Sequence, residues 1–384
     1  MTNPLPQSDH PARWWAPLPD ARIECRACPR LCKLRAGQRG FCFVRQNVGG
    51  RLVLTTYGRS SGFCVDPIEK KPLHHFYPGT SVLSFGTAGC NLGCRFCQNW
   101  YISKAREFDR LTHEATPELI AANAQNLGCW SVAFTYNDPV VFAEYAMDVA
   151  DACREAGLAT VAVTAGYMLE ESRREFYQHI DAANVDLKGF TEEFYQRHCG
   201  GTLAPVLETL KYLRQATSVW LEVTTLLIPG ENDGERELAE AADWFAANLG
   251  PDVPWHFTAF HPDYKMLDKP GTPAASLIRA RTIAQARGLH YVYTGNVRDP
   301  AGSSTWCPGC GQRVIERNGY AIGDWKLAHG HCTQCGCEIA GHFLQQPGHW
   351  GNRRQPVPLG DSHDLLASPG RSAPIMPARG ACVQ

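Results

Sequence analysis

Three cysteines, Cys90, Cys94 and Cys97, lie in one short loop with the spacing C-x3-C-x2-C. The loop follows the apolar run 81–85, which is typical of a buried strand. Each iron of a four-iron cluster needs its own external ligand, so three thiolates leave one iron open to a small molecule. A zinc knuckle is the alternative, but residues 98–100 provide no fourth ligand. The spacing therefore favours a [4Fe-4S] cluster with one open position.

A second group of cysteines precedes this loop and consists of Cys25, Cys28, Cys32 and Cys42, with the spacing C-x2-C-x3-C-x9-C. Four thiols so close together are enough for a tetrahedral zinc ion or for a complete iron–sulfur cluster. The spacing alone does not choose the metal. We interpret this second group as a structural metal site rather than as an auxiliary redox cluster.

A third group consists of two C-x2-C pairs, Cys307 with Cys310 and Cys332 with Cys335, separated by twenty-one residues. This pattern is typical of a zinc ribbon. A glycine after the second cysteine of each pair suits a tight knuckle whose backbone amides point at sulfur. Cys337 is a spare thiol that could substitute as a ligand. We expect one zinc ion at this ribbon.

The composition limits the class of protein. The net charge of −1 over 384 residues gives no overall attraction to nucleic acid or to an anionic membrane. The sequence has no run of eighteen apolar residues, and its start lacks a basic-then-apolar signal pattern. Seventeen cysteines in tight clusters, without such a signal, favour metal ligation over disulfides. We expect a cytoplasmic protein with no membrane partner, and a nucleic-acid partner is disfavoured.

From residue 81 to about 297, short β-rich runs alternate with longer amphipathic ones. The predicted strands are 82–86, 131–135, 159–164, 183–187, 219–227, 255–260 and 291–293. The predicted helices are 117–126, 140–156, 170–179, 204–216, 235–249 and 274–288. This alternation indicates an α/β fold of parallel strands with right-handed crossovers. About six units are too few for a closed barrel of eight, so we predict a partial (β/α)6 TIM-like barrel, with its chemistry at the carboxyl ends of the strands.

The same patterns divide the chain into five parts. We predict an irregular arm (1–20), a cysteine-rich metal-binding segment with a connector (21–80), the barrel (81–300), the zinc ribbon (301–345) and a disordered tail (346–384). The tail is predicted to be disordered because it is rich in Pro, Gly, Ser and Arg and poor in apolar residues.

The loop around Cys90, with an aromatic residue before its last cysteine, resembles the cluster-binding loop of radical SAM enzymes. Roughly residues 22–343 resemble the radical SAM enzymes of the AmmeMemoRadiSam system, within the wider family of glycyl-radical-enzyme activating proteins. The N-terminal cysteine block, the stretch Glu-Lys-Lys-Pro-Leu at 69–73 and the C-terminal ribbon carry this resemblance.

The resemblance implies that the open iron binds S-adenosylmethionine (SAM). Reductive cleavage of SAM would then produce a 5′-deoxyadenosyl radical, which abstracts hydrogen from a substrate that the resemblance does not identify. We expect an electron donor such as a flavodoxin or a ferredoxin. Association with AMMECR-type and Memo-type proteins is also implied.

The resemblance further assigns SAM contacts to polar residues at strand ends. Asn137 or Asp138 would accept hydrogen bonds from the SAM amino group, and Asp138 also suits the cap of the next helix. Asp186 would bind the ribose hydroxyls and Lys188 the SAM carboxylate, with a surface salt bridge between the two as the alternative. Family members are expected to carry Glu where this chain has Asp138.

Three further contacts are expected around the adenosine. His256 is the predicted cofactor contact on the sixth strand, and His261 lies nearer the mouth where substrate would enter. Asn296, after Gly295, and Phe96, beside Cys97, are expected near the adenine. The turn 164–166 departs from the family pattern, because it has Ala rather than Asn before Gly.

Two other functions are compatible with these motifs. A glycyl radical activase would use the same cluster loop, but it has no evident need for a ribbon. A zinc-ribbon binding module with a non-catalytic barrel would not need Cys90, Cys94 and Cys97, which are all intact.

Overall fold

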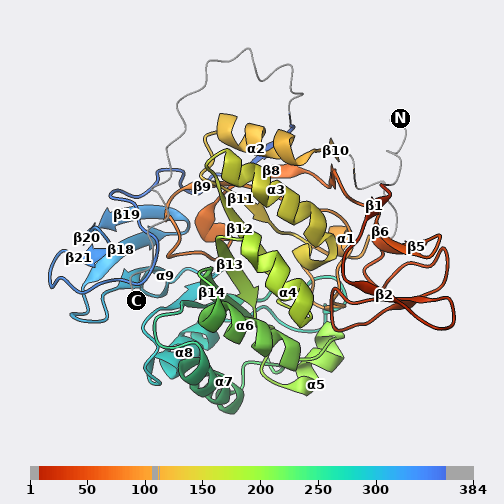
Figure 1. The fold of residues 1–384 in the computed structure, drawn as a ribbon. Coiled ribbons are helices and arrows are strands. Elements are labelled where there is room, and N and C mark those ends of the chain that lie inside the picture. Colours follow the sequence, from red (N-terminus) through yellow and green to blue (C-terminus); the bar gives the residue numbers. More distant parts are fainter. Residues whose placement is uncertain (1–7, 106–110, 112, 360–384) are drawn as a thin grey trace.

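A nine-stranded sheet lies at the centre of the computed structural model, which describes residues 8–105, 111 and 113–359 (Figure 1). The strand order is β16–β15–β14–β13–β12–β11–β9–β8–β22. The strands from β16 to β9 in this order are parallel. They are β9 (Ser81–Phe85), β11 (Ser131–Phe134), β12 (Ala159–Thr164), β13 (Ala182–Asp186), β14 (Trp220–Leu227), β15 (Trp255–Ala259) and β16 (Val292–Gly295).

Helices connect these parallel strands and cover one face of the sheet (Figure 1). They are α2 (Pro117–Asn126), α3 (Ala143–Glu155), α4 (Glu170–Phe176), α6 (Ala204–Ala216), α7 (Glu235–Asn248) and α8 (Ala274–Gln285). Short turns extend some of them, namely η3 (Pro139–Phe142), η4 (Tyr177–His179), α5 (Glu192–Phe194) and the π-helical turn η5 (Tyr195–Cys199). The predicted α/β fold with a parallel sheet is confirmed, with six connecting helices and a seventh parallel strand.

Two antiparallel strands extend the sheet beyond β9. β8 (Phe63–Pro67) pairs with β9, and the 3-10 turn η1 (Ile68–Lys70) joins them. β22 (Gln355–Val357) pairs with β8. The prediction of a disordered tail was therefore wrong at 355–357, because backbone hydrogen bonds to an open sheet edge do not require an apolar sequence. Residues 360–384 of that predicted tail lie outside the described residues.

The N-terminal segment forms small antiparallel sheets beside the barrel. Their strands are β1 (His10–Pro11), β2 (Trp15–Pro17), β3 (Ile23–Cys25), β4 (Lys33–Leu34), β5 (Arg45–Val48), β6 (Arg51–Leu54), β7 (Arg59–Ser60) and β10 (His113–Glu114). Trp14 is 6% exposed and belongs to the same apolar core as the barrel strands. Arg45 forms a buried ion pair with Glu144 of α3, with 2.5 Å between Nη2 and Oε2. The predicted arm thus contains strands and packs tightly on the barrel, while residues 1–7 lie outside the described part.

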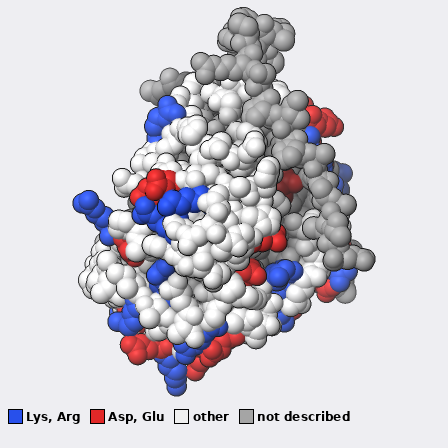
Figure 2. All heavy atoms as spheres, turned by 90° about the vertical axis from the view of Figure 1, so that its left-hand side faces the viewer, with Lys and Arg blue, Asp and Glu red and all other residues white. Residues whose placement is uncertain are grey.

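A third unit follows the barrel, and its small apolar core also includes Tyr291 and Tyr293 at β16. It consists of α9 (Pro300–Ser303), β17 (Thr305–Trp306), β18 (Arg313–Asn318), β19 (Ala321–Trp325), β20 (Leu327–Ala328) and β21 (His331–Cys332). Buried Arg317 joins this unit to the connector before β9, because its Nη2 donates to the carbonyl of His74 at 2.7 Å. Figure 2 views the molecule from this side and shows cationic and anionic side chains next to one another. The described helices are all too short or too polar to cross a bilayer.

Candidate active site

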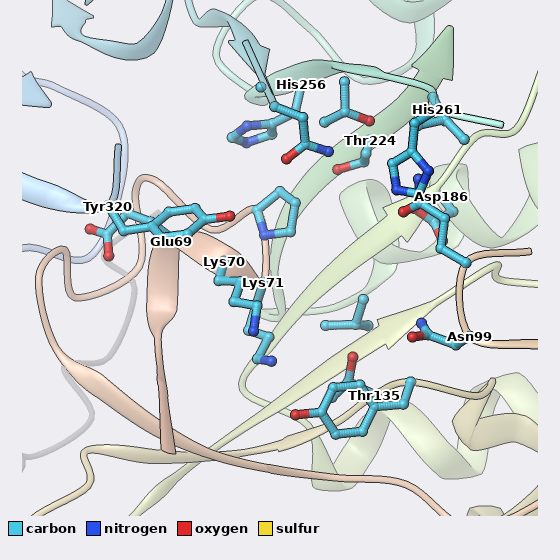
Figure 3. A pocket seen from close by; sticks show the side chains of 18 of the residues that line it. Glu69, Lys70, Lys71, Asn99, Thr135, Asp186, Thr224, His256, His261 and Tyr320 are labelled. Atoms are coloured by element: carbon cyan, nitrogen blue, oxygen red, sulfur yellow. The ribbon is translucent and has the colours of Figure 1, made fainter. Parts of the chain in front are cut away.

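A cavity of about 1390 Å³ opens at the carboxyl ends of the parallel strands. The three-cysteine loop, the connector 69–74 and the third unit all contribute to its lining. In Figure 3, Asn99, two residues after Cys97, lies on the right, and Glu69 of the connector and Tyr320 of the third unit lie on the left. The cavity is lined by all the residues that were predicted to bind the iron–sulfur cluster, SAM or the substrate: Cys90, Cys94, Phe96, Cys97, Asn137, Asp138, Asp186, Lys188, His256, His261 and Asn296. The topology therefore brings these residues to one place.

Two glycines let the cysteine loop pass close to its neighbours. A Cβ on Gly86 would lie 2.4 Å from the carbonyl oxygen of Thr135. Gly89 has φ +76°, and its Cβ would lie 1.9 Å from the carbonyl oxygen of Cys42. Asn137 fixes the same backbone, since it accepts from the amide of Thr87 and donates to the carbonyl of Gly89, both at 2.9 Å. Asn137 thus positions the loop, a role that the sequence did not indicate, and its contact with SAM stays a prediction.

The three sulfurs of the loop all take part in hydrogen bonds. The amide of Leu92 donates to Cys90 Sγ at 3.5 Å, and Cys97 Sγ shares a hydrogen bond of 3.1 Å with Ser103 Oγ in α1 (Trp100–Ser103). A hydrogen bond from the buried thiol of Cys199 lowers the pKa of Cys94 to about 6, against the effect of burial. Such bonds stabilise thiolates and therefore suit metal ligands.

The spacing of these sulfurs suits a cluster better than a single ion. Among the described residues, the group at Cys307 is the one set of three or more metal-ligating side chains whose ligand atoms all lie within 4.8 Å of one another. At least one pair of the sulfurs of Cys90, Cys94 and Cys97 is therefore more than 4.8 Å apart. A cluster needs this arrangement, because each thiolate binds a different iron. The residues present fit a [4Fe-4S] cluster.

Asp138 links two strand ends at the floor of the cavity. Its carboxylate accepts from Val140 N at 3.1 Å, which caps η3, and from Thr164 Oγ1 at 3.0 Å and Ala165 N at 2.9 Å. Burial raises the pKa of Asp138 and these hydrogen bonds partly oppose it. The predicted capping role is present, and the unusual Thr-Ala-Gly turn is a direct partner of Asp138.

Asp186 ends β13, Lys188 follows it, and both residues line the cavity. Lys188 Nζ lies 2.5 Å from Asp186 Oδ2. Burial disfavours the charged amine of Lys188, but Asp186 and the Cys94 sulfur outweigh burial and raise its pKa. Lys188 therefore stays cationic next to the cluster loop. An ammonium has three donors, so its ion pair with Asp186 leaves others for a ligand.

His256 on β15 belongs to a buried network around Glu222 of β14. His256 Nε2 lies 2.7 Å from Glu222 Oε2, and the amides of His74 and His75 donate to the same carboxylate at 2.9 and 2.8 Å. Burial opposes ionisation of Glu222, but these partners lower its pKa. His256 is 3% exposed and still lines the cavity.

Among the described residues that line the cavity, five have a buried polar side-chain atom without a hydrogen-bond partner: Glu69 Oε2, His74 Nδ1, Gln98 Nε2, Thr224 Oγ1 and Arg317 Nε. Buried polar groups are rarely left unpaired, because each costs about 1–3 kcal/mol. Burial raises the pKa of Glu69 to about 7, and Arg317 opposes the shift. Sequence reasoning gave these residues no role in the site, since no local motif marks them. Figure 3 shows Glu69 beside Tyr320, across the cavity from Asp186.

The remaining predicted contacts lie at the rim or in the wall. The ring of Phe96 is buried and packs on Phe194, with 5.9 Å between the ring centroids. Asn296 is exposed and has φ 60°, a strained value that brings its backbone close to the cavity mouth. His261 is exposed at the same mouth.

The other two cysteine groups lie outside this cavity. In the C-terminal group, Cys307 and Cys335 have sulfurs 3.6 Å apart, and those of Cys310 and Cys332 are 3.8 Å apart. This group could hold a metal ion. The N-terminal four, Cys25, Cys28, Cys32 and Cys42, line a separate small cavity of about 20 Å³.

Three sulfurs face a large cavity at the carboxyl edge of a parallel sheet, which is the position of the active site in α/β barrel enzymes. Residues 85–242 match the Radical SAM superfamily. An uncharacterized protein of Methanocaldococcus jannaschii is 42% identical over 306 residues, which cover 80% of this chain and 91% of that protein. The chain therefore contains a radical SAM superfamily domain.

Solved structures also show similarity to this chain. A radical SAM methyltransferase from Sphaerobacter thermophilus has a TM-score of 0.46 and 17% identity, over 62% of this chain and 71% of that one. A domain of the pyruvate-formate lyase-activating enzyme from Bacteroides vulgatus has a TM-score of 0.39 and 18% identity, over 43% of this chain and 99% of that one.

Proposed function

We propose that this protein binds a [4Fe-4S] cluster at Cys90, Cys94 and Cys97 and reductively cleaves SAM to abstract hydrogen from a substrate in the same cavity. The observation that carries the proposal is the shared cavity of about 1390 Å³, which contains the cysteines and the polar strand ends. Ligand pockets usually measure about 300–1,000 Å³, so this cavity has room for more than one ligand.

The cluster would supply the electron that breaks the sulfonium bond of SAM. The residues of the chain have the tasks of binding and orientation. Lys188 provides a fixed positive charge for the SAM carboxylate, and Asp186 offers acceptors for ribose hydroxyls. Asp138 ties two strand ends together, and Asn137 holds the backbone of the cysteine loop. The ligand atoms therefore need little rearrangement when the cluster and SAM bind.

We propose that the substrate binds between the connector, the third unit and β14, where Glu69, His74 and Thr224 present unpartnered polar atoms. Neutral His74, whose pKa burial lowers well below its usual value, can accept or donate one hydrogen bond. These groups suit a polar substrate with hydroxyl or amide functions.

The finer assignment is to an AmmeMemoRadiSam-type system. Its support is the N-terminal cysteine block, the stretch 69–73 and the C-terminal cysteine group. An electron donor such as flavodoxin or ferredoxin, and AMMECR-type and Memo-type partners, stay predictions.

Anaerobic reconstitution with iron, sulfide, SAM and a strong reductant tests the proposed activity. We expect 5′-deoxyadenosine to form, and we expect the electron paramagnetic resonance spectrum of the reduced cluster to change when SAM is added. An unchanged spectrum at saturating SAM, with no 5′-deoxyadenosine, would contradict the proposal.

We also propose that the C-terminal group holds one zinc ion. Tetrahedral zinc with bonds of about 2.3 Å places its sulfurs about 3.8 Å apart, and the separations in this group are 3.6 and 3.8 Å. Cys307→Ala should lower the zinc content by about one per chain, because a structural site needs all four ligands. Cys337→Ala is the matched control and should keep its zinc. Cys337 could replace Cys307 as a ligand, so Cys307→Ala/Cys337→Ala is measured as well. An unchanged zinc content in both Cys307→Ala and this double variant would contradict the assignment.

Glu69 should make the stability of the protein depend on pH. Its pKa is about 7 in the folded state against 4.5 ordinarily, so the folded state binds the proton more tightly. Its stabilising contribution is present below pH 4.5 and is lost as the pH rises through 7, by about 3 kcal/mol. Glu69→Gln imitates the protonated form and should be increasingly more stable than wild type from pH 5 to pH 8. Urea unfolding across this range measures the gap, and a constant gap would contradict the buried-proton interpretation.

A further inference from the structure

We infer that Cys25, Cys28, Cys32 and Cys42 hold a second iron–sulfur cluster, and not the structural metal site that we expected from the sequence. All four residues line one cavity of about 20 Å³. The cavity is also lined by Ala27, Gly40, Val140 and Val141, with Arg30, Arg45 and Asn91 as its polar neighbours. Four thiols that line one small space form a complete donor set.

The spacing of the sulfurs separates the two metals. The C-terminal cysteines serve as an internal reference, because their ligand atoms all lie within 4.8 Å of one another, as one tetrahedral ion requires. The four N-terminal cysteines are all described, yet no three of them meet that limit. Their thiolates would reach separate irons of a cluster, whereas a single zinc ion would leave at least one unbound.

The surroundings of these sulfurs suit buried thiolates. The amide of Phe41 donates to Cys32 Sγ at 3.5 Å. The guanidinium of Arg45 lines the same cavity and acts as a positive charge on Cys25 and Cys42. Metal binding displaces the thiol protons, and Arg45 offsets part of the negative charge that results. Hydrogen bonds and positive charge near the sulfurs are also what tune the potential of iron–sulfur clusters.

The site lies directly against the loop of the first cluster. Asn91, which lines the small cavity, follows Cys90 in sequence, and Arg30 donates to its carbonyl oxygen. On the other side, the carbonyl of Cys42 packs on Gly89. A redox centre in this position can take up one electron from a low-potential protein donor and release that one electron again. A zinc ion could not do so.

The metal content of a variant without the first cluster tests the inference. Cys90→Ala/Cys94→Ala/Cys97→Ala, purified anaerobically, should contain iron and acid-labile sulfide in equal amounts, two or four of each per chain. Adding Cys28→Ala and Cys32→Ala should remove both. Adding Cys129→Ala, a buried cysteine in neither group, should leave both unchanged.

Two results would overturn the second cluster: an iron-free triple variant with one extra zinc per chain, or a folded triple variant with no second metal at all. Circular dichroism and the zinc at the C-terminal group report folding. If the triple variant does not fold, the wild-type chain and Cys28→Ala/Cys32→Ala are compared instead, and the variant should lose two or four irons. The second cluster is judged without SAM, so failure of the proposed SAM cleavage leaves this result unaffected.

Discussion

Cys94→Ala is expected to abolish 5′-deoxyadenosine formation while the C-terminal group keeps its zinc. Cys94 is the cluster-loop thiol with the lowered pKa, and Cys199 and Lys188 both favour its thiolate. Its loss leaves one iron of the cluster without a protein ligand. Product formation is followed by chromatography after a single anaerobic incubation with SAM and reductant.

The neighbour Cys199 makes a second variant necessary. Because Cys199 is hydrogen-bonded to Cys94, its sulfur could replace the missing ligand. Cys94→Ala/Cys199→Ala closes this route and should be inactive even if Cys94→Ala keeps a trace of activity. Cys153→Ala, which removes a thiol buried in α3, is the matched control and should stay active. Activity in the double variant at the wild-type level would show that Cys94 is not a cluster ligand.

Much of the barrel could be predicted from periodicity, because its signals are local. The bounds of α2 and α6 match the predicted ranges 117–126 and 204–216. Each helix has a proline in its first turn, and Thr116 caps α2 by accepting from Leu119 N at 3.3 Å. The sheet edge could not be predicted in this way. β8 and β22 pair across most of the chain, and nothing in either short sequence indicates its partner.

The candidate site likewise contains residues that local sequence patterns indicate and residues that only the fold brings into place. The cysteine loop and the polar strand ends were found, because motif spacing and strand position are properties of the sequence. Cys199 and Glu69 were missed, because their importance comes from what they approach in three dimensions: the thiol of Cys94, and a cavity wall in which a carboxyl oxygen has no partner. Asn137 was predicted as a SAM contact, but the sequence did not indicate that its side chain also forms hydrogen bonds with the backbone of the cysteine loop.

Lys188→Ala is expected to weaken SAM binding roughly tenfold to a hundredfold. A charge-assisted hydrogen bond to the SAM carboxylate contributes about 1.5–3 kcal/mol, and each 1.4 kcal/mol corresponds to about a tenfold change in affinity. In wild type, the ammonium already faces the cavity, paired with Asp186 at 2.5 Å. The measurement is a SAM titration of the reconstituted protein, with the iron content showing that the cluster is intact.

Two comparisons separate a SAM contact from a general charge effect. Lys70→Ala is the matched control, because Lys70 lines the opposite side of the same cavity and is ion-paired with Asp66 at 2.7 Å (Figure 3). It should bind SAM as wild type does. Lys188→Ala also leaves Asp186 unpaired, so Lys188→Ala/Asp186→Asn measures how much of the loss comes from that bare carboxylate. Wild-type affinity in Lys188→Ala would mean that the ion pair only supports the cavity wall, and the SAM carboxylate would then need another cation.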